Sequence, residues 1–381
     1  MDFRLGPKSD AFREEVRAFV ADNVDDELFE RAAATGTMHD WAVHHALGSR
    51  GWIAAGWPVE YGGQGRDPYE MTALKDELRL AGVPQDGIGN TMIVANTLRH
   101  DGTEEQKRKF LPPALAGEYI FALGYSEPDS GSDVAAAKTR ATRDGDEWVI
   151  NGSKLYITNG AQADWICLLA RTSGESGHRG MSQIVVETDR PGFRVSRTLD
   201  KLGNRSSDTA ELSFADVRVP VSHTIGEIGR GFQQQMEQFQ AERMIAAYLQ
   251  VGAMQKALER TREYLARRRV FGRPLLANDH IAYRLAELSA QLDLVRHYNY
   301  ACAEAYLRGE DTTRFATVAK LAVGRLAREI ADTCLQFHGG TGYMEETWTA
   351  RFYRDSRLIS IGGGADEVML SVLARLDGFT A

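Results

Sequence analysis

The sequence predicts an α+β protein of several domains, helical at both ends and β-rich in the middle. The chain has 381 residues, and at roughly 100–200 residues per domain this length suits two or three domains. Apolar residues recur at helical spacing up to about residue 120, alternate as in strands over the next stretch, and return to helical spacing from Gly231 onward. These changes of period place the expected domain boundaries near residues 120 and 230.

The charge and composition of the chain exclude several classes of protein. Its 45 Lys and Arg residues are outnumbered by 53 Asp and Glu residues, for a net charge of -8. This balance argues against nucleic-acid binding, whose affinity comes mainly from cations on phosphates. No apolar run approaches the roughly 18–20 residues that cross a bilayer, and no apolar stretch follows a basic one at the start. We therefore expect neither a membrane span nor a secretory signal.

The cysteines bear on the compartment. They are odd in number and widely spaced, which suits free thiols in a reducing environment: Cys167, Cys302 and Cys334. We therefore expect a cytoplasmic protein.

The first domain is predicted to consist of helices joined by short Gly/Pro loops. Asp10 is the expected N-cap of one helix, in which four apolar residues fall on one face: Phe12, Val16, Phe19 and Val20. A later helix is expected to begin at Thr103 and to be stopped by the paired prolines Pro112 and Pro113.

The middle of the chain is predicted to form short strands. Residues 147–158 contain two β-rich runs around Asn151-Gly152, which is a strong hairpin signal. Further β-rich runs follow at residues 165–170, 183–187 and 210–220, separated by turn residues. This spacing predicts an antiparallel barrel or sandwich and argues against alternating βαβ units.

The last third of the chain is predicted to be a helical bundle. The helical period holds from Gly231 almost to the end, and prolines are rare in it. Long helices of this kind fit an antiparallel bundle. One helix carries an apolar stripe formed by Ile281, Leu285, Leu288, Leu292 and Val295.

The first candidate site is the segment Gly124-Tyr-Ser-Glu-Pro-Asp-Ser-Gly-Ser-Asp133, at the junction of the helical and β regions. Such a loop exposes backbone N–H groups and Ser hydroxyls, which suit a pyrophosphate or the edge of a flavin. The same residues also fit an ordinary capped turn. No Gly-x-Gly-x-x-Gly follows a strand, so a Rossmann dinucleotide site has no support.

A second candidate is the strand that carries Tyr156 and Thr158. These residues alternate with Leu155 and Ile157, which places an aromatic ring and a hydroxyl on the same side of the strand. That pair could stack on a ring and donate to one of its nitrogens. An ordinary hairpin strand would show the same pattern.

A third candidate is Glu242-Arg243, which lies among apolar neighbours in a predicted helix. An acid in such a stretch belongs either to the solvated face or to a partly desolvated site, where its pKa rises and it becomes a usable base. A fourth candidate is the pair of glycine-rich segments at residues 336–343 and 361–368, which either leave backbone bare for a ligand or simply connect helices.

Metal and hydrolase sites have no support in the sequence. His39, His44 and His45 lack a matching acid or cysteine partner, and no His-Glu-x-x-His occurs, so we expect no metal. No Gly-x-Ser-x-Gly elbow marks a serine hydrolase.

Together these segments resemble the acyl-CoA dehydrogenase family over essentially the whole chain and in the right order. Matches occur at 124–133, at Tyr156-Ile-Thr-Asn-Gly160, at Arg268-Arg-Val-Phe-Gly272, at Gln336-Phe-His-Gly-Gly340 and at Ile361-Gly-Gly-Gly-Ala-Asp-Glu-Val368. The resemblance implies an N-terminal α-helical domain (1–120), a central antiparallel β-barrel (121–228) and a C-terminal four-helix bundle (229–381). It also implies bound FAD and a homotetramer built as a dimer of dimers.

The resemblance also assigns roles to residues. Tyr156 would stack on the isoalloxazine and Thr158 would hydrogen-bond near N5, while Ser132 would lie near the pyrophosphate or the CoA moiety. FAD would also be held from a neighbouring subunit, by Arg268, Phe271, Gln336 and the backbone of Gly339 and Gly340. The implied cofactor set is Leu123, Tyr125, Ser126, Ser132, Tyr156, Thr158, Arg268, Phe271, Gln336, Gly339, Gly340, Ala365 and Glu367. The implied substrate set is Ser132, Gln240, Arg243 and Gly363.

The sequence departs from many family members at positions assigned to cofactor binding and at the position of the catalytic base. Ala365 and Glu367 replace a Thr and a Gln or Glu, and Asp279 stands where a Gln is frequent. Short- and medium-chain members carry the catalytic Glu in a Tyr-Glu-Gly-Thr motif, where this chain has Gly363. A second branch, which includes the isovaleryl- and long-chain enzymes, carries it on the bundle helix before an Arg, as in Glu242-Arg243.

The resemblance implies α,β-dehydrogenation of an acyl-CoA thioester to a trans-2-enoyl-CoA. Glu242 would remove the α-proton, flavin N5 would accept the β-hydride, and an electron-transfer flavoprotein would receive the electrons. A branched or medium- to long-chain acyl group is expected. The alternatives are a flavin oxidase or monooxygenase, a dehydrogenase of acyl-carrier-protein thioesters, and a non-catalytic subunit of a mixed oligomer.

Overall fold

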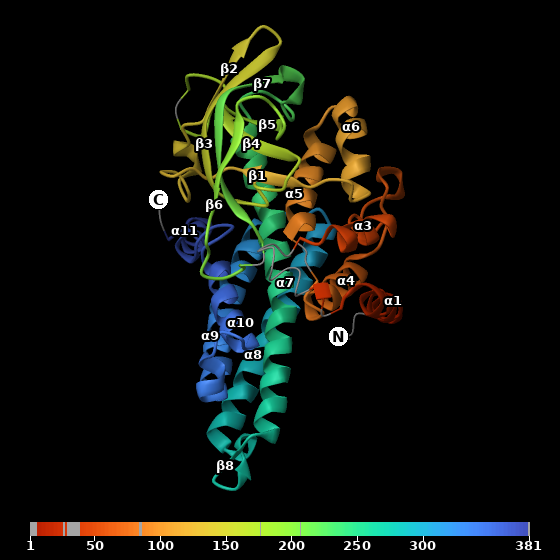
Figure 1. Ribbon diagram of the computed structural model, residues 1–381, viewed down its shortest axis with the longest axis vertical. Coiled ribbons are helices and arrows are strands. Elements are labelled where there is room, and N and C mark those ends of the chain that lie inside the picture. The colour runs from red at the N-terminus through yellow and green to blue at the C-terminus, as the bar shows by residue number, and fades with distance from the viewer. Residues whose placement is uncertain are drawn as a thin grey trace.

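The computed structural model describes residues 6–25, 27–28, 39–83, 86–175, 177–205 and 207–379. The molecule is elongated, with the β-sheet at one end and the long C-terminal helices at the other (Figure 1). Helix α7 (Gly231–Arg267) runs from beside the sheet to the far tip of the bundle. This helix therefore extends from the β-rich region to the tip of the helical bundle, two regions that both contain predicted site residues.

The N-terminal region consists of helices that pack beside α7. They are α1 (Pro7–Asn23), α3 (Trp41–Ser49), α4 (Pro68–Leu80), α5 (Asp86–Asp101) and α6 (Glu104–Leu115). The predicted apolar face of α1 is confirmed, because Phe12, Val16 and Phe19 are fully buried. The predicted cap is wrong: Gly6 is the N-cap, and Asp10 lies in the first turn, since a proline near the start is pre-organised for helix.

Helix α6 begins where the sequence predicts but ends later. Thr103 forms a capping box with Gln106, which satisfies two backbone donors. The helix then continues through Pro112 and Pro113 to Leu115. Two prolines remove two backbone donors but keep helical φ angles. The buried side chains that follow them hold the last turn against the core.

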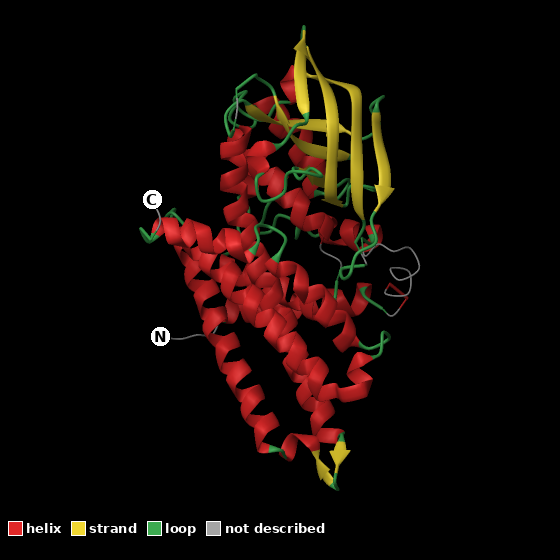
Figure 2. Ribbon diagram, turned by 90° about the vertical axis from the view of Figure 1, so that its left-hand side faces the viewer, coloured by secondary structure: helices red, strands yellow, loops and turns green. Residues whose placement is uncertain are grey.

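The central region is a mixed sheet rather than a purely antiparallel one. Its strands are β1 (Phe121–Gly124), β2 (Arg140–Asp144), β3 (Glu147–Thr158), β4 (Trp165–Arg171), β5 (Met181–Glu187), β6 (Phe193–Thr198) and β7 (Thr209–Pro220). Strands β2–β3, β3–β7, β6–β7 and β4–β5 pair antiparallel, whereas β1 pairs with β4 in parallel. The antiparallel expectation fails there because the β2–β3 hairpin intervenes and the chain returns beside β1 in the same direction. Among the described strands the sheet curls without closing (Figure 2).

The predicted hairpin at Asn151-Gly152 is wrong, since both residues lie inside the single strand β3. The turn lies earlier, between β2 and β3, where Gly145 has φ 64°. At Asn151-Gly152 the register with β7 shifts instead, and the Asn151 side chain exchanges two hydrogen bonds with Asp216. A Cβ on Gly152 would lie 2.6 Å from Oγ1 of Thr139. The glycine therefore permits a bulge and a close approach rather than a turn.

The C-terminal region is helical, as predicted. Helices α8 (Asp279–Leu307) and α9 (Thr313–His338) pack with α7, and α10 (Trp348–Ser356) and α11 (Asp366–Leu376) lie against α9. The predicted stripe on α8 is confirmed, because Ile281, Leu288 and Leu292 are buried. A short ribbon, β8 (Arg269–Val270) and β9 (Arg273–Pro274), joins α7 to α8 at the tip.

Two further expectations concern helices and thiols. Within the described residues, no helix is both long enough and apolar enough to span a bilayer. The three cysteines are buried and free, as the sequence predicts.

Candidate active site

The structure brings Glu242 and Gly363 together, although they are far apart in the sequence. Glu242 lies on α7, and Gly363 lies in the turn between the 3-10 helix η6 (Arg357–Ser360) and α11. A Cβ placed on Gly363, whose φ is 63°, would lie 3.1 Å from Oε1 of Glu242. The carboxylate therefore fills the space that a side chain at position 363 would need.

Partial burial shapes the electrostatics of Glu242. Burial raises its pKa, while the nearby cations Arg243 and Lys320 oppose that rise. Arg243 is itself buried, and its guanidinium carbon lies 5.8 Å from the ring centre of Phe239. Burial lowers the pKa of Arg243, and Glu242 opposes that change. A carboxylate with a raised pKa beside buried cations is suited to accept a proton near neutral pH.

The loop after β1 is held from within the core. The Tyr125 side chain is buried, and its hydroxyl donates to Oε1 of Gln238 on α7. Burial raises the pKa of Tyr125 well above its usual range. Only the backbone of Tyr125 therefore remains for a ligand. Leu123 and Ser126 are partly buried, and the carbonyl of Ser126 accepts a 2.9 Å hydrogen bond from the amide of Leu155.

A buried ion pair, which the sequence reasoning missed, supports the same loop. The ammonium of Lys154 is fully buried and donates to Oε1 of Glu127 at 2.9 Å and to the Tyr125 carbonyl at 3.1 Å. The Glu127 carboxylate also accepts from the amides of Lys138 (2.6 Å) and Thr139 (2.9 Å). Burial lowers the pKa of Lys154 to about 8 despite Glu127. A lysine in the middle of a β-rich run was the available signal.

Tyr156 lies in a strained part of β3. The register between β3 and β7 shifts between Lys154 and Ile157, and Tyr156 has φ 64°, which is rare for a residue with a side chain. Tyr156 is 67% exposed. Thr158 is partly buried, and its carbonyl accepts a 3.4 Å hydrogen bond from Nδ2 of Asn90 on α5. The bulge thus leaves the aromatic residue exposed two positions before Thr158.

Several predicted cofactor residues lie far from Tyr156 within one chain. Arg268 ends α7, and Phe271 is fully exposed in the ribbon at the tip of the bundle (Figure 1). Gln336, Gly339 and Gly340 lie at the end of α9, where the ring of His338 stacks on Tyr264 at 4.2 Å. The chain alone therefore does not bring these residues to the sheet.

The remaining predicted residues lie near the glycine turn or at the start of α9. Ala365 is the N-cap of α11, without a side-chain cap, and Glu367 is exposed in its first turn. Gln240 is tied to α9 instead of facing Glu242. Its amide donates to Oγ1 of Thr313 at 2.7 Å, and two positions along a helix correspond to a rotation of about 200°.

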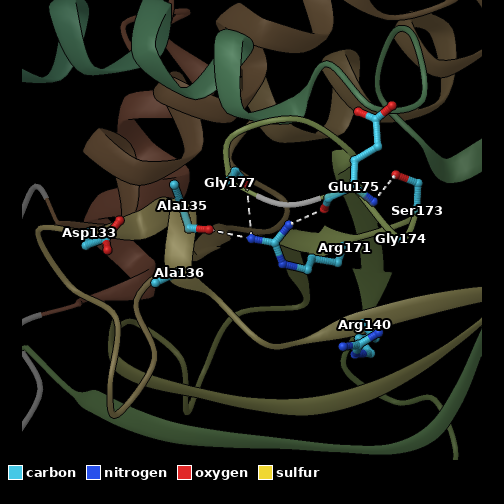
Figure 3. Close-up of a pocket in the computed structure, with 9 residues that line it drawn as sticks. All are labelled: Asp133, Ala135, Ala136, Arg140, Arg171, Ser173, Gly174, Glu175 and Gly177. Atoms are coloured by element: carbon cyan, nitrogen blue, oxygen red, sulfur yellow. Dashed lines mark hydrogen bonds between the residues drawn. The ribbon is translucent and has the colours of Figure 1, made fainter.

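A pocket of about 480 Å³ lies beside the loop that contains Ser132 (Figure 3). It is lined by Asp133, Ala135, Ala136, Arg140, Arg171, Ser173, Gly174, Glu175 and Gly177. The Arg171 guanidinium donates to four backbone carbonyls around the pocket, those of Ala135, Ala137, Glu175 and Gly177. Ser132 and Arg140 are exposed. The pocket thus joins the predicted Ser132 region to an arginine, Arg140, that sequence reasoning did not single out.

Three family models match consecutive parts of the chain. "Acyl-CoA dehydrogenase, N-terminal domain" matches residues 6–118, "Acyl-CoA dehydrogenase, middle domain" matches 122–217, and "Acyl-CoA dehydrogenase, C-terminal domain" matches 229–376.

Individual relatives agree with these matches. The mitochondrial long-chain specific acyl-CoA dehydrogenase of Sus scrofa is 34% identical over 369 residues, which cover 96% of this chain and 85% of that protein. The mitochondrial isovaleryl-CoA dehydrogenase of Bos taurus is 36% identical over 333 residues, covering 86% and 78%. The solved acyl-CoA dehydrogenase of Geobacillus kaustophilus superposes with a TM-score of 0.93 at 34% identity and covers 99% of each chain.

Proposed function

The chain belongs to the acyl-CoA dehydrogenase family, and on this premise we propose that it oxidises a branched or medium- to long-chain acyl-CoA to the trans-2-enoyl-CoA with Glu242 as base. The observation that carries the proposal is the position of the Glu242 carboxylate against Gly363. Two places in this family hold the base, and here a glycine at one leaves room for the carboxylate from the other.

The residues around Glu242 suit removal of an α-proton. A thioester α-proton is too weak an acid for a carboxylate unless the charge that develops on the carbonyl oxygen is stabilised. The backbone N–H of Gly363 is the proposed protein donor to that oxygen. Arg243 and Lys320 favour the ionised form of Glu242, so they oppose the effect of burial and keep the carboxylate able to accept the proton. Gln240, engaged with α9, has no assigned part in this step.

Members of this family are FAD-dependent flavoproteins, and the residues of this chain fit that cofactor. The outward ring of Tyr156, at a strained bulge, offers a face for a flat ring system, and Thr158 offers a hydroxyl beside it. Space is open around Gly339 and Gly340, where an added Cβ would meet no heavy atom within 4 Å. When bound, FAD supplies the acceptor for the β-hydride.

The distant residues of the cofactor set have a place in an assembly. We assign Arg268, Phe271, Gln336, Gly339 and Gly340 to the FAD of a neighbouring subunit, because they lie at the far end of α7 and α9. A homotetramer and an electron-transfer flavoprotein as electron acceptor complete the proposal.

Anaerobic titration of the yellow protein with a panel of straight, branched and aryl acyl-CoA thioesters tests the function. We expect the flavin absorbance to bleach with at least one branched or medium- to long-chain member. Bleaching only with acyl-carrier-protein thioesters would contradict the CoA assignment. Rapid oxygen consumption in an electrode would identify an oxidase or monooxygenase. Failure of the pure chain to bind flavin or to bleach with any thioester would identify a non-catalytic subunit.

The pocket beside Ser132 is the proposed place for the nucleotide end of CoA. Its exposed cation Arg140 would contact a phosphate, a contact that does not change as the acyl group reacts. Such uniform binding affects KM and leaves kcat unchanged. We therefore expect Arg140→Gln to raise KM for acyl-CoA about 3- to 10-fold, as for the loss of one exposed charged contact.

A truncated substrate and a neighbouring arginine provide the controls. The KM for the matching acyl-pantetheine, which lacks the nucleotide, should not change in Arg140→Gln. Arg143→Gln alters an exposed arginine of the same strand that hydrogen-bonds the Gly145 carbonyl instead. It should leave both KM values unchanged. An equal rise with both substrates would show that Arg140 does not contact the nucleotide.

A further inference from the structure

A fully buried lysine, Lys320, lies on α9 close to the proposed base. Its side chain has no exposed surface, whereas lysine is almost never fully buried unless it is paired. Its Nζ donates a hydrogen bond to the backbone carbonyl of Gly364. The lysine thus binds the backbone of the turn that contains Gly363.

Two further residues on α9 hold the same segment. Gly324 and Arg328 follow Lys320 at intervals of four residues, so all three lie along one face of the helix. A Cβ on Gly324 would lie 2.9 Å from Oγ of Ser360 and 3.5 Å from Oδ1 of Asp366, so only a glycine lets the segment pack this closely. Arg328 forms a 3.2 Å ion pair with Oδ2 of Asp366. Three successive turns of α9 therefore contact the segment 360–366.

The held segment needs such support because its glycines have unusual backbone angles. Gly363 has φ 63° and Gly364 has φ 97°, and glycine adopts these conformations readily but also loses most freedom when it is fixed. The turn lies beside the base, because a Cβ built on Gly363 would lie 3.1 Å from Oε1 of Glu242. A small shift of the turn would therefore change the distance between the Gly363 amide and the carboxylate.

The charged groups around Lys320 come from three helices. Glu242 and Arg243 lie on α7, Arg328 lies on α9 and Asp366 lies on α11. Burial lowers the pKa of Lys320 to about 8, while Asp366 and Glu242 favour its charged form and Arg243 opposes it. At neutral pH the buried site thus holds an ammonium that both donates to the turn and favours the ionised base.

We propose that Lys320 is a positioning residue of the reaction: through its hydrogen bond to the Gly364 carbonyl it fixes the turn that presents the Gly363 amide beside the Glu242 carboxylate. The proposal rests on the function proposed above, since it assigns a part to a residue that touches neither substrate nor cofactor. Lys320 acts through the turn, and its charge adds to that of Arg243 around the base.

Lys320→Met tests the proposal, because methionine fills a similar volume without a donor or a charge. We expect kcat to fall on the order of 10- to 100-fold, as for a misplaced reacting group, with KM changed less than about twofold. The acid limb of the pH profile of kcat/KM should move to higher pH, because loss of a cation raises the pKa of Glu242 further. A merely structural lysine would move neither the limb nor the ratio of kcat to KM.

The matched control is Arg325→Met, which removes an exposed cation from the same helix and should leave kcat and the limb unchanged. Lys320→Gln, which keeps an N–H donor without the charge, serves if the Met variant fails to fold. We expect it to retain more kcat than Met while its acid limb still shifts. A kcat above half of the wild-type value together with an unshifted limb, in whichever variant folds, would overturn the proposal.

Amide hydrogen exchange of residues 361–365 separates this proposal from the function itself. Loss of the Lys320 hydrogen bond should speed exchange in this segment whether or not an acyl-CoA reacts. Unchanged exchange in Lys320→Met would show that the hydrogen bond does not fix the turn, and would overturn the proposal even if the enzyme is active. Faster exchange in Lys320→Met with an unchanged kcat would show that Lys320 fixes the turn but has no part in the reaction, which also overturns the proposal. Faster exchange in Lys320→Met, combined with a wild-type protein that oxidises no thioester, would refute the proposed function and not the hydrogen bond.

Discussion

Glu242→Gln is expected to leave a yellow, FAD-containing protein that no acyl-CoA bleaches. Glutamine keeps the size of the side chain but cannot take a proton, so the α-proton of the thioester has no acceptor. A general base contributes about 10²–10⁴-fold to a rate, and we expect a loss near the upper end because, among the described residues, Glu242 is the only acid within 4 Å of a Cβ built on Gly363. Stopped-flow measurement of flavin reduction under anaerobic conditions gives the rate directly.

Two variants make the assignment specific. Glu237→Gln changes an exposed acid on the same helix and should reduce flavin at the wild-type rate. The double change Glu242→Gly with Gly363→Glu moves the carboxylate from α7 to the glycine turn, where a Cβ at position 363 would lie 3.1 Å from the present Oε1 of Glu242. We expect it to recover part of the lost rate, limited by the roughly 1–2 kcal/mol that a side chain pays at φ 63°. Wild-type turnover by Glu242→Gln would disprove the base assignment.

Lys154→Met is expected to have the largest effect on stability. The change leaves the Glu127 carboxylate buried without its ion-pair partner, and the Tyr125 carbonyl without its donor. Breaking a buried pair by removing one partner costs about 3–5 kcal/mol. We expect a lower thermal midpoint and a lower FAD content, because the same pair holds the loop from Tyr125 to Ser132. Calorimetry and the ratio of flavin to protein absorbance measure the two effects.

The same loop offers a matched surface control. Lys138 forms a 2.9 Å ion pair with Asp129, and both side chains are exposed. Exposed pairs contribute little, so Lys138→Met should leave the midpoint and the FAD content unchanged. Adding Glu127→Gln to Lys154→Met should restore part of the midpoint, since the buried charge is then removed as well. Equal losses in Lys154→Met and Lys138→Met would show that burial of the pair is not the cause.

The sequence predicted the order of the regions because periodicity depends on local burial. The face of α1 and the stripe on α8 follow from apolar spacing alone and are confirmed. Details that depend on distant partners were missed. Asn151-Gly152 has the composition of a hairpin turn, but Thr139 and Asp216 approach it and make it a bulge. The parallel pairing of β1 with β4 likewise depends on where an intervening hairpin folds.

The candidate site shows the same division. The resemblance to a family directed attention to Glu242 and Gly363, and the structure places them side by side. The assigned roles of all the site residues stay predictions. Lys154 and Lys320 were missed because a lysine in a sequence is normally taken as solvated, and only a three-dimensional structure shows that both are fully buried. Their partners are a carboxylate 27 positions away and a backbone carbonyl 44 positions away.

The unbroken length of α7 determines which subunit of an assembly a substitution would affect. Arg268 follows Glu242 by 26 positions, and at 1.5 Å per residue these two residues stand about 39 Å apart along the helix. One chain cannot bring both to a single flavin. With the tip assigned to a neighbour's cofactor, a lesion at Arg268 or Phe271 would harm the adjacent copy and spare its own base. Each copy would then supply the base of its own site and the tip residues that hold the cofactor of its neighbour. Activity would therefore depend on pairs of chains and not on single ones.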